Sequence, residues 1–284
     1  MPNTRYTDDA VYPNFLYIGA PKAGSSWIFE SLLEHPEVYV PIAKDVQFFD
    51  LHYDKGLAWY LAFFRAGQGK RAVGELSHDY YLYPEVAERI RRDLPGVRLF
   101  CCLRDPIGET MSVYLQQRKE FVGSQIGFDE YAFRPETLKR SDYYTNLLPF
   151  YERFPAERIR VLFFDELKAD AAAFIREVYE FLQVDAGYLP RSLDRRVLPA
   201  SEPRSFGFAH FCYQAGFTLR KLGLANVVGR VKRNPAFSNL LYKPLEAKPQ
   251  ISPEVEARLK AYYRERYAGL PALIGRPLPA AWAL

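Results

Sequence analysis

The fold of this chain is decided by the stretch Phe15–Phe29, which reads FLYIGAPKAGSSWIF. Four apolar residues at 15–18 predict a buried strand, and a turn rich in small residues follows them. A helix is predicted from Ser25, with apolar residues along one side. Small residues let the backbone approach an anion, and the start of a helix supplies N–H donors and partial positive charge. The stretch therefore predicts a phosphate-binding loop.

The lysine of this loop does not stand where a nucleoside-triphosphate P-loop has it. That loop reads G-x-x-x-x-G-K-[ST], with Lys directly after the second Gly. Here Lys22 precedes Gly24, and two hydroxyl residues, Ser25 and Ser26, follow the glycine. The loop is therefore P-loop-like and departs from the triphosphate pattern at its lysine.

A second motif follows the apolar strand predicted at 97–103. It begins with Arg104-Asp105-Pro106, and Ser112 lies on the helix predicted next. An Arg fork and a hydroxyl that converge from a strand end and a helix fit a phosphate monoester. Taken alone, the motif is more often an Arg paired with Asp105 and a solvated Ser. Beside the first loop, the phosphate-binding interpretation is favoured.

The composition describes an ordinary globular protein. The chain has 284 residues, of which 49% are hydrophobic and 25% are charged, without repeats. We expect one domain over 1–284, with 187–250 as a less certain region that could cover the substrate or cofactor. The net charge of +4, with interspersed charges, favours small anionic ligands over nucleic acid.

Cysteine and histidine usage and the polar N-terminus suggest where the protein works. Three cysteines make no disulfide framework, and the four histidines show no metal spacing with them, so no metal is expected. No signal peptide and no apolar run of transmembrane length are recognised. The sequence thus predicts a cytoplasmic protein without a membrane partner, and it leaves the oligomeric state open.

Strands and helices alternate along the chain. Strands are predicted at 15–18, 38–40, 72–76, 97–103 and 159–164. Helices are predicted at 25–35, 56–66, 84–93, 107–119, 144–153, 169–182, 206–224 and 253–267. This alternation predicts an α/β fold with a central parallel sheet covered by helices on both faces. Ligands of such sheets bind beyond the carboxyl ends of the strands, where both motifs lie.

Both motifs resemble those of the sulfotransferases. The order Pro-Lys-x-Gly-[Ser/Thr]-[Ser/Thr]-Trp at 21–27 resembles the family's 5′-phosphosulfate loop, and Arg-[Asp/Asn]-Pro-(x)5-Ser at 104–112 resembles its 3′-phosphate motif. Further similar stretches lie at 34–49, 144–167 and 259–282. The resemblance implies that the enzyme takes sulfate from 3′-phosphoadenosine 5′-phosphosulfate (PAPS), leaving 3′-phosphoadenosine 5′-phosphate (PAP).

The resemblance also implies roles for individual residues. Arg104 and Ser112 would hold the 3′-phosphate, and Lys22 would follow the bridging oxygen as the P–O–S bond breaks. The remaining cofactor-binding residues of the first loop are Ala23, Gly24, Ser25, Ser26 and Trp27. For Trp27, stacking on adenine and packing in the core are equally favoured.

Two residues compete for the role of catalytic base. A Glu in the motif K-E-x-x-F-F serves in the glycan-type branch, and this chain has Asp45 there, within KDVQFF at 44–49. A His after the second core strand serves in the cytosolic branch, and His78 follows 72–76. An imidazole accepts a proton near neutrality with little tuning, so His78 is slightly favoured. The two can also act as a pair, with the carboxylate orienting the ring.

Two positions depart from the family pattern. Glu109 stands where the family often has a basic residue, which removes a structural or phosphate-facing cation. Leu76 stands where the glycan-type branch often has Lys, which argues against a highly anionic glycan as acceptor. The region 45–83 is rich in aromatic residues, which either pack in the core or line a cleft for an apolar or aromatic small-molecule acceptor. The basic residues Arg230, Lys232 and Arg233 either close over the nucleotide or form a solvated loop.

The favoured function is sulfuryl transfer from PAPS to a hydroxyl of a small natural-product acceptor. An ATP-dependent small-molecule kinase is the first alternative, although the placement of Lys22 and the lack of a clear Mg²⁺-binding carboxylate argue against it. A non-catalytic nucleotide-binding protein is the second. It would need Arg104 and Ser112 but no base.

Overall fold

The computed structural model of the chain describes residues 10–120, 126–193, 201–221, 228, 231, 234–244 and 249–284. It divides into two compact units. Unit 1 comprises Met1–Ala20, Gly24–Cys102 and Pro149–Arg195, and unit 2 comprises Pro21–Ala23, Leu103–Leu148 and Arg196–Leu284. The expectation of a single sulfotransferase domain over 1–284 stays a prediction.

Unit 1 is built on a five-stranded sheet in the order β2-β3-β1-β4-β5. Its strands are β1 (Phe15–Gly19), β2 (Val38–Tyr39), β3 (Ala72–Leu76), β4 (Arg98–Leu103) and β5 (Ile159–Phe163). Strand β1 pairs in parallel with β3 and with β4, and β2 pairs in parallel with β3. Every residue of β1 and β3 is buried, as expected of parallel strands covered on both faces. The predicted α/β fold with a parallel central sheet is confirmed.

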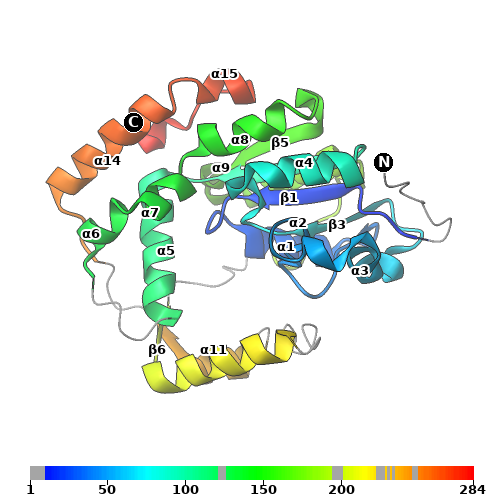
Figure 1. Ribbon diagram of the computed structural model, residues 1–284, viewed down its shortest axis with the longest axis horizontal. Helices are drawn as coiled ribbons and strands as arrows, with labels where there is room; N and C mark the ends of the chain where they lie inside the picture. The colour runs from blue at the N-terminus through cyan, green and yellow to red at the C-terminus, as the bar shows by residue number, and fades with distance from the viewer. Residues whose placement is uncertain are drawn as a thin grey trace. The chain divides into compact units, whose positions relative to one another are not determined.

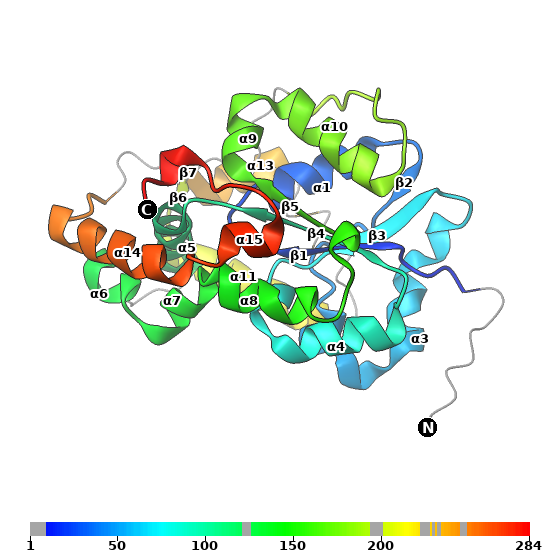
Figure 2. The same ribbon diagram turned by 90° about the horizontal axis from the view of Figure 1, so that it is seen from above.

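Helices cover both faces of this sheet (Figures 1 and 2). One face carries α1 (Ser25–Glu34), α9 (Phe164–Ala169) and α10 (Ala171–Leu182), and the other carries α3 (Leu57–Leu61) and α4 (Pro84–Asp93). Helix α10 packs on the sheet through an edge contact of Phe181 with Phe100, and on α1 through a hydrogen bond from the Tyr179 hydroxyl to the Ser31 carbonyl. Helix α1, which follows β1, is therefore fixed in part by its contact with α10.

Two glycines make the close approaches around this region. Gly74 lies in β3 opposite Phe15 of β1, and a Cβ at that position would collide with the Phe15 carbonyl oxygen. Gly24 precedes α1 with φ +89°, and a Cβ there would come within 2.8 Å of the Leu167 side chain. Both positions therefore exclude a side chain, for steric and conformational reasons.

The aromatic residues of 45–83 mostly pack in the interior of unit 1. Six of them are buried, namely Phe48, Phe49, Tyr60, Phe64, Tyr80 and Tyr81. Phe48 of α2 (Phe48–Leu51) stacks on Tyr60 with ring centroids 4.5 Å apart, and Phe49 meets Tyr80 edge to face. Core packing, the plainer of the two interpretations of this region, therefore accounts for these six rings.

Unit 2 is organised around the long helix α5 (Pro106–Glu120), which contacts α6 (Phe128–Ala132), α11 (Phe206–Lys221) and α14 (Pro253–Arg266). Its other elements are α7 (Pro135–Arg140), the first part of α8 (Tyr143–Tyr151), α13 (Pro235–Leu241), α15 (Leu270–Ile274), and the antiparallel pair β6 (Ser201–Pro203) and β7 (Tyr242–Pro244). Ser252 caps α14 by accepting a hydrogen bond from the Val255 N–H.

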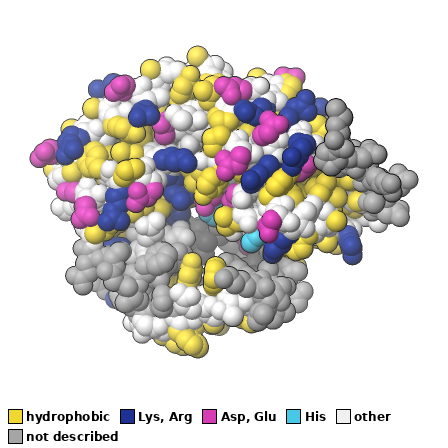
Figure 3. Space-filling model, in the orientation of Figure 1, with side chains coloured by type: hydrophobic (Ala, Val, Ile, Leu, Met, Phe, Trp, Pro, Cys, Tyr) yellow, Lys and Arg dark blue, Asp and Glu magenta, His cyan; other side chains and the backbone are white. Residues whose placement is uncertain are grey.

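Most predicted elements are found within a few residues of their expected bounds. The helix predicted at 56–66 is α3 continued by a 3-10 helix over Ala62–Gly67. The helix predicted at 169–182 begins at Ala171, because the Asp170 carboxylate accepts the Ala173 N–H and caps it. The basic residues Arg230, Lys232 and Arg233 lie outside the described residues. Figure 3 shows Lys and Arg interspersed with Asp and Glu on the face drawn.

Candidate active site

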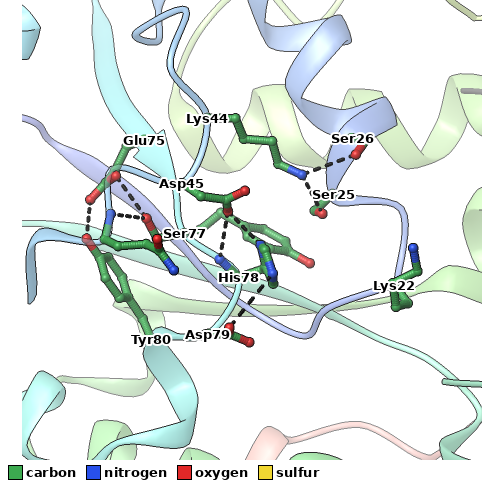
Figure 4. Close-up of polar contacts among 12 residues, drawn as sticks. Lys22, Ser25, Ser26, Lys44, Asp45, Glu75, Ser77, His78, Asp79 and Tyr80 are labelled. Atoms are coloured by element: carbon green, nitrogen blue, oxygen red, sulfur yellow. Dashed lines mark hydrogen bonds and ion pairs between the residues drawn. The ribbon is translucent and has the colours of Figure 1, made fainter. Parts of the chain in front are cut away.

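The start of α1 presents two serine hydroxyls beside a lysine. The Lys44 ammonium donates hydrogen bonds to Ser25 Oγ at 2.9 Å and to Ser26 Oγ at 3.2 Å (Figure 4). In the described structure no side chain caps the first turn of α1, so its backbone N–H groups add partial positive charge. A cation, two hydroxyls and a helix N-terminus together form a group suited to an anion.

Lys44 is a residue that the sequence reasoning missed as a ligand-binding candidate. Burial lowers its pKa from the ordinary lysine value, although Asp45 and Glu30 partly oppose this shift. A lysine at the positive end of a helix is electrostatically unfavourable without an anion nearby. The signal was present in the sequence, because Lys44 is the first residue of the KDVQFF stretch.

Asp45 and His78, the two candidates for the base, are in contact. Asp45 Oδ1 lies 2.6 Å from His78 Nδ1 and accepts the backbone N–H of His78 at 3.4 Å (Figure 4). The two side chains are 26% and 30% exposed, so a ligand can reach them. Asp45 adopts a left-handed backbone conformation with φ 60°, and its own N–H donates to the Leu76 carbonyl at 3.0 Å. The pair is therefore fixed by side-chain and backbone hydrogen bonds together.

The contact shifts the pKa values of both partners. Burial alone would raise the pKa of Asp45, but the charge of His78, its hydrogen bonds and Lys44 outweigh it and lower the pKa to about 2. Burial alone would lower the pKa of His78, but Asp45, and then Asp79 with its carboxylate 3.9 Å from Nε2, raise it above the ordinary value. Asp45 is therefore ionised near neutral pH, and the imidazole is the group that exchanges a proton there.

Trp27 is packed inside unit 1. Its side chain is 7% exposed, and its indole N–H donates to the Ser192 carbonyl at 3.1 Å. Its ring lies edge to face with Phe174 of α10, with centroids 6.1 Å apart. These contacts match the core-packing interpretation, and stacking on adenine stays a prediction without support from them.

In unit 2, the loop residues Lys22 and Ala23 lie against α5 and the end of β4. Lys22 has a left-handed backbone with φ 59°, and its ammonium donates to Gln116 Oε1 at 2.8 Å. Arg104 donates through Nη1 to the Lys22 carbonyl at 2.9 Å. Ala23 is fully buried. Arg104 thus supports the backbone of the loop that carries the candidate catalytic lysine.

One face of α5 joins the polar residues of this unit. Gly108, Ser112 and Gln116 are spaced four residues apart, so they lie above one another on the helix. A Cβ at Gly108 would come within 3.3 Å of Arg104 Nε, so the glycine leaves room for the guanidinium. The helix therefore places Ser112 one turn from Gly108, which lies beside Arg104, and one turn from Gln116, which accepts from Lys22. The structure thus brings Lys22, Arg104 and Ser112 to one surface of unit 2.

Glu109, the departure from the family pattern, points into the interior of unit 2. Its carboxylate accepts a short hydrogen bond from Ser141 Oγ and one from the Tyr143 hydroxyl at 3.1 Å. The same hydroxyl lies 2.9 Å from the Arg104 carbonyl oxygen. Burial raises the pKa of Glu109 to about 7, although Ser141 and Arg140 partly offset the rise. The residue therefore supports the strand end that carries Arg104 and does not face a phosphate.

No described helix is both long enough and apolar enough to cross a membrane. No group of three or more His, Cys, Asp or Glu side chains in the described part could hold a metal ion. The expectation of no metal stays a prediction.

Comparison with known proteins gives the class of protein that these features define. The family model described as a sulfotransferase domain matches residues 13–201, so the chain belongs to the sulfotransferase family. Human heparan sulfate glucosamine 3-O-sulfotransferase 5 is 24% identical over 94% of this chain and 73% of its own length. The chain spans only 22% and 31% of the length of two other curated relatives, a Dictyostelium discoideum and a mouse sulfotransferase.

Two solved structures share the fold. A sulfotransferase from Alicyclobacillus acidocaldarius superposes with a TM-score of 0.69 over 96% of this chain and 100% of its own, at 21% identity. Mouse sulfotransferase SULT7A1, crystallised with PAP, superposes with a TM-score of 0.53 over 92% of this chain and 85% of its own, at 13% identity. At these identities the likeness establishes the fold, and the roles of individual residues rest on the geometry described above.

Proposed function

We propose that the protein transfers a sulfuryl group from PAPS to a hydroxyl group of a small, apolar or aromatic acceptor. The observation that carries the proposal is the Asp45–His78 pair, because a protein that only bound nucleotides would need no base oriented by a carboxylate. Membership of the sulfotransferase family supports the class of reaction.

Each unit offers polar residues whose chemistry suits one anionic group of the donor. Lys44, Ser25 and Ser26 with the start of α1 suit the 5′-phosphosulfate, because they offer a cation, hydroxyls and backbone N–H groups. Arg104 and Ser112 suit the 3′-phosphate. PAPS, when bound, supplies an activated sulfuryl group attached to a phosphate leaving group. Lys22 would stabilise the charge that develops on the bridging oxygen.

His78 would accept the proton of the acceptor hydroxyl. The acceptor oxygen forms a bond to sulfur while the bond from sulfur to the phosphate oxygen breaks, and that oxygen leaves with the electron pair. Asp45 holds the Nδ1 side of the ring, which leaves Nε2 as the accepting atom. Asp45 raises the pKa of His78, so the neutral ring that can act as a base forms at a higher pH than in an ordinary histidine.

The acceptor class rests on a narrower observation. Leu76 is buried, so this position presents no cation where the glycan-type branch often has Lys. The buried aromatic residues of 48–81 do not bear on the acceptor, because they pack against one another. The similarity to a heparan sulfate sulfotransferase makes a glycan the alternative acceptor to be tested.

The first experiment compares the thermal shifts produced by 3′,5′-ADP, AMP, ADP and ATP–Mg²⁺. A ligand that binds only the folded state raises Tm according to its affinity. A shift specific to 3′,5′-ADP supports the donor site, whereas a shift with ATP–Mg²⁺ alone contradicts it. Transfer of labelled sulfate from PAPS to phenols, sterols, polyketide alcohols and heparan-type polysaccharides then identifies the acceptor. Transfer to the polysaccharides alone would overturn the acceptor proposed here.

A further inference from the structure

A buried carboxylate lies beneath the Asp45–His78 pair. Glu75 is the fourth residue of β3 and is 1% exposed. Its Oε1 accepts hydrogen bonds from the hydroxyls of Tyr60 at 2.9 Å and Tyr80 at 2.6 Å, and its Oε2 accepts one from Ser77 Oγ at 3.0 Å. Both carboxylate oxygens are therefore satisfied by neutral donors inside the fold.

Two of these donors continue to the segment that carries Asp45. The Tyr80 hydroxyl accepts the backbone N–H of Phe48 at 2.9 Å and of Phe49 at 3.3 Å, and Ser77 Oγ accepts the backbone N–H of Gln47 at 3.1 Å. Figure 4 shows the hydrogen bonds that join Glu75 to Ser77 and to Tyr80. These contacts satisfy the first N–H groups of α2, which would otherwise lack partners. Glu75 thus orients the two hydroxyls that anchor residues 47–49.

The burial of this carboxylate is costly, which indicates that its contacts matter. Burial raises the pKa of Glu75 to about 7, and the hydrogen bonds from Tyr80, Tyr60 and Ser77 oppose the rise only partly. Asp50 is the neighbouring charge that adds to it. A buried leucine would avoid this cost but could not orient a serine and a tyrosine hydroxyl together.

We propose that Glu75 is a positioning residue that fixes the Asp45–His78 pair through Ser77, Tyr80 and the backbone of residues 47–49. Asp45 lies two residues before this anchored backbone, and His78 lies between Ser77 and Tyr80. Both members of the pair are therefore attached to the segments that Glu75 holds. The inference rests on the proposed function for its catalytic consequence, whereas the geometric consequence stands without it.

The test titrates His78 by NMR, a readout that needs no enzymatic activity. The charged groups acting on His78 are Asp45, Asp79 and Lys44, and Asp50 is also coupled to it; none of them is changed in the variants. We expect Glu75→Ala and Tyr80→Phe to return the pKa of His78 toward that of an unperturbed histidine, because the contact with Asp45 loosens. Tyr179→Phe, which removes a buried hydroxyl bonded to Ser31 elsewhere in unit 1, is the matched control.

A second readout separates positioning from folding. Turnover should fall on the order of a hundredfold in Tyr80→Phe, as expected for a small misplacement of reacting groups, while the Kd for 3′,5′-ADP stays unchanged. Glu75→Gln keeps an oxygen that accepts from both tyrosines. Its turnover should therefore be close to that of the native protein and well above that of Glu75→Ala. If Glu75→Ala does not fold, Tyr80→Phe and Ser77→Ala carry the test.

Failure of the positioning role and failure of the proposed function give different results in these experiments. An unchanged pKa of His78 in folded Tyr80→Phe and Ser77→Ala would overturn the positioning role. Absence of any sulfate transfer by the native protein would overturn the proposed function, and the titration would still decide the role of Glu75. A shifted pKa in the Tyr179→Phe control would show a general effect of buried hydroxyls and would also overturn the positioning role.

Discussion

Each compact unit contains a buried glutamate behind its polar site residues. The two glutamates differ in how many of their carboxylate oxygens accept hydrogen bonds. Glu75 of unit 1 uses both carboxylate oxygens as acceptors. Glu109 of unit 2 uses Oε2 for Ser141 and Tyr143, while Oε1 is buried without a hydrogen-bond partner among the described residues. Burial raises the pKa of both to about 7.

The difference reflects what each carboxylate supports. Glu75 connects through Ser77 and Tyr80 to three backbone N–H groups, in the segment next to the proposed base, whose position would have to be precise. Glu109 connects through Tyr143 to the carbonyl of Arg104, whose long side chain could adjust to the phosphate that we propose it binds. We infer that a fully hydrogen-bonded carboxylate supports the proposed acid–base pair, and that a partly hydrogen-bonded one suffices behind the arginine proposed to bind a phosphate.

The largest expected effect is at His78, which lies with Glu75 in unit 1. His78→Ala should lower turnover by roughly 10² to 10⁴, the usual contribution of a general base. The Kd for 3′,5′-ADP should stay within twofold, because the ring contacts Asp45 and not the donor-binding residues. Steady-state kinetics and calorimetry measure the two quantities, and His52→Ala is the matched control in the same unit.

The pH profile decides between the two candidate bases. With His78 as base, kcat/KM should rise with pH through a pKa above that of an ordinary histidine and then level off. With Asp45 as base, its pKa of about 2 would leave the neutral range flat. A flat profile, or a larger loss in Asp45→Asn than in His78→Ala, would transfer the role to Asp45.

The next effect is on the free energy of unfolding, and it tests the contribution of Glu109. Its pKa rises from 4.5 to about 7 on folding, so the folded state binds the proton more tightly and stability falls as the pH rises between these values. Glu109→Gln removes this loss, which amounts to about 3 kcal/mol over the full range. Urea unfolding at pH 5 and pH 8 should show the variant gaining on the native protein with rising pH. Glu88→Gln, a change at a surface ion pair, should show no such gain.

A smaller effect is expected at Arg104, which lies with Glu109 in unit 2. Arg104→Ala should weaken binding of 3′,5′-ADP about 10- to 100-fold, the value of a charged hydrogen-bonding group. AMP, which lacks the 3′-phosphate, should bind almost as before. Arg118→Ala, an exposed change on α5, provides the control in the calorimetric titration. Equal losses for both nucleotides would instead indicate that Arg104 acts only by holding the Lys22 carbonyl.

The smallest effect is expected at Lys44 and tests the other end of the donor. Lys44→Met should weaken AMP and 3′,5′-ADP by the same factor, about tenfold, because both carry the 5′-phosphate. Lys55→Met, at an exposed lysine over Trp59, is the control. Unchanged affinity for both nucleotides would remove Lys44 from the donor site and leave it as a structural partner of Ser25 and Ser26.

Periodic apolar segments made much of the fold predictable. Strands β1, β3 and β4 and helices α4 and α14 follow from continuous or helical apolar patterns and from their flanking Pro and Ser residues. The contact between Asp45 and His78 was among the alternatives, because a base can be oriented by a carboxylate. The short helices α2, α6 and α7 carry too few turns to show a period.

The remaining features depend on long-range packing. The bond from Lys44 to Ser25 joins residues 19 positions apart, and the contacts of Trp27 depend on residues from the second half of the chain. Neither distance is written in a local pattern. The inward direction of Glu109 was missed for the same reason, since a glutamate on a helix is usually solvated. Ring stacking of Phe48 on Tyr60 likewise becomes visible only once η1 (Tyr53–Lys55) turns the chain back.

The left-handed backbone of Asp45 restricts how this position can vary through evolution. Gly occupies that conformation without steric cost and Asp and Asn are enriched in it, whereas β-branched residues are outliers there. A lineage could therefore exchange Asp45 for Asn in a single substitution and keep the fold while losing the charge. A glutamate at this position would carry a modest backbone cost, and Lys22 and Gln47, with φ 59° and 55°, show that this chain accepts longer side chains in the same conformation. A β-branched residue, by contrast, would be a backbone outlier there.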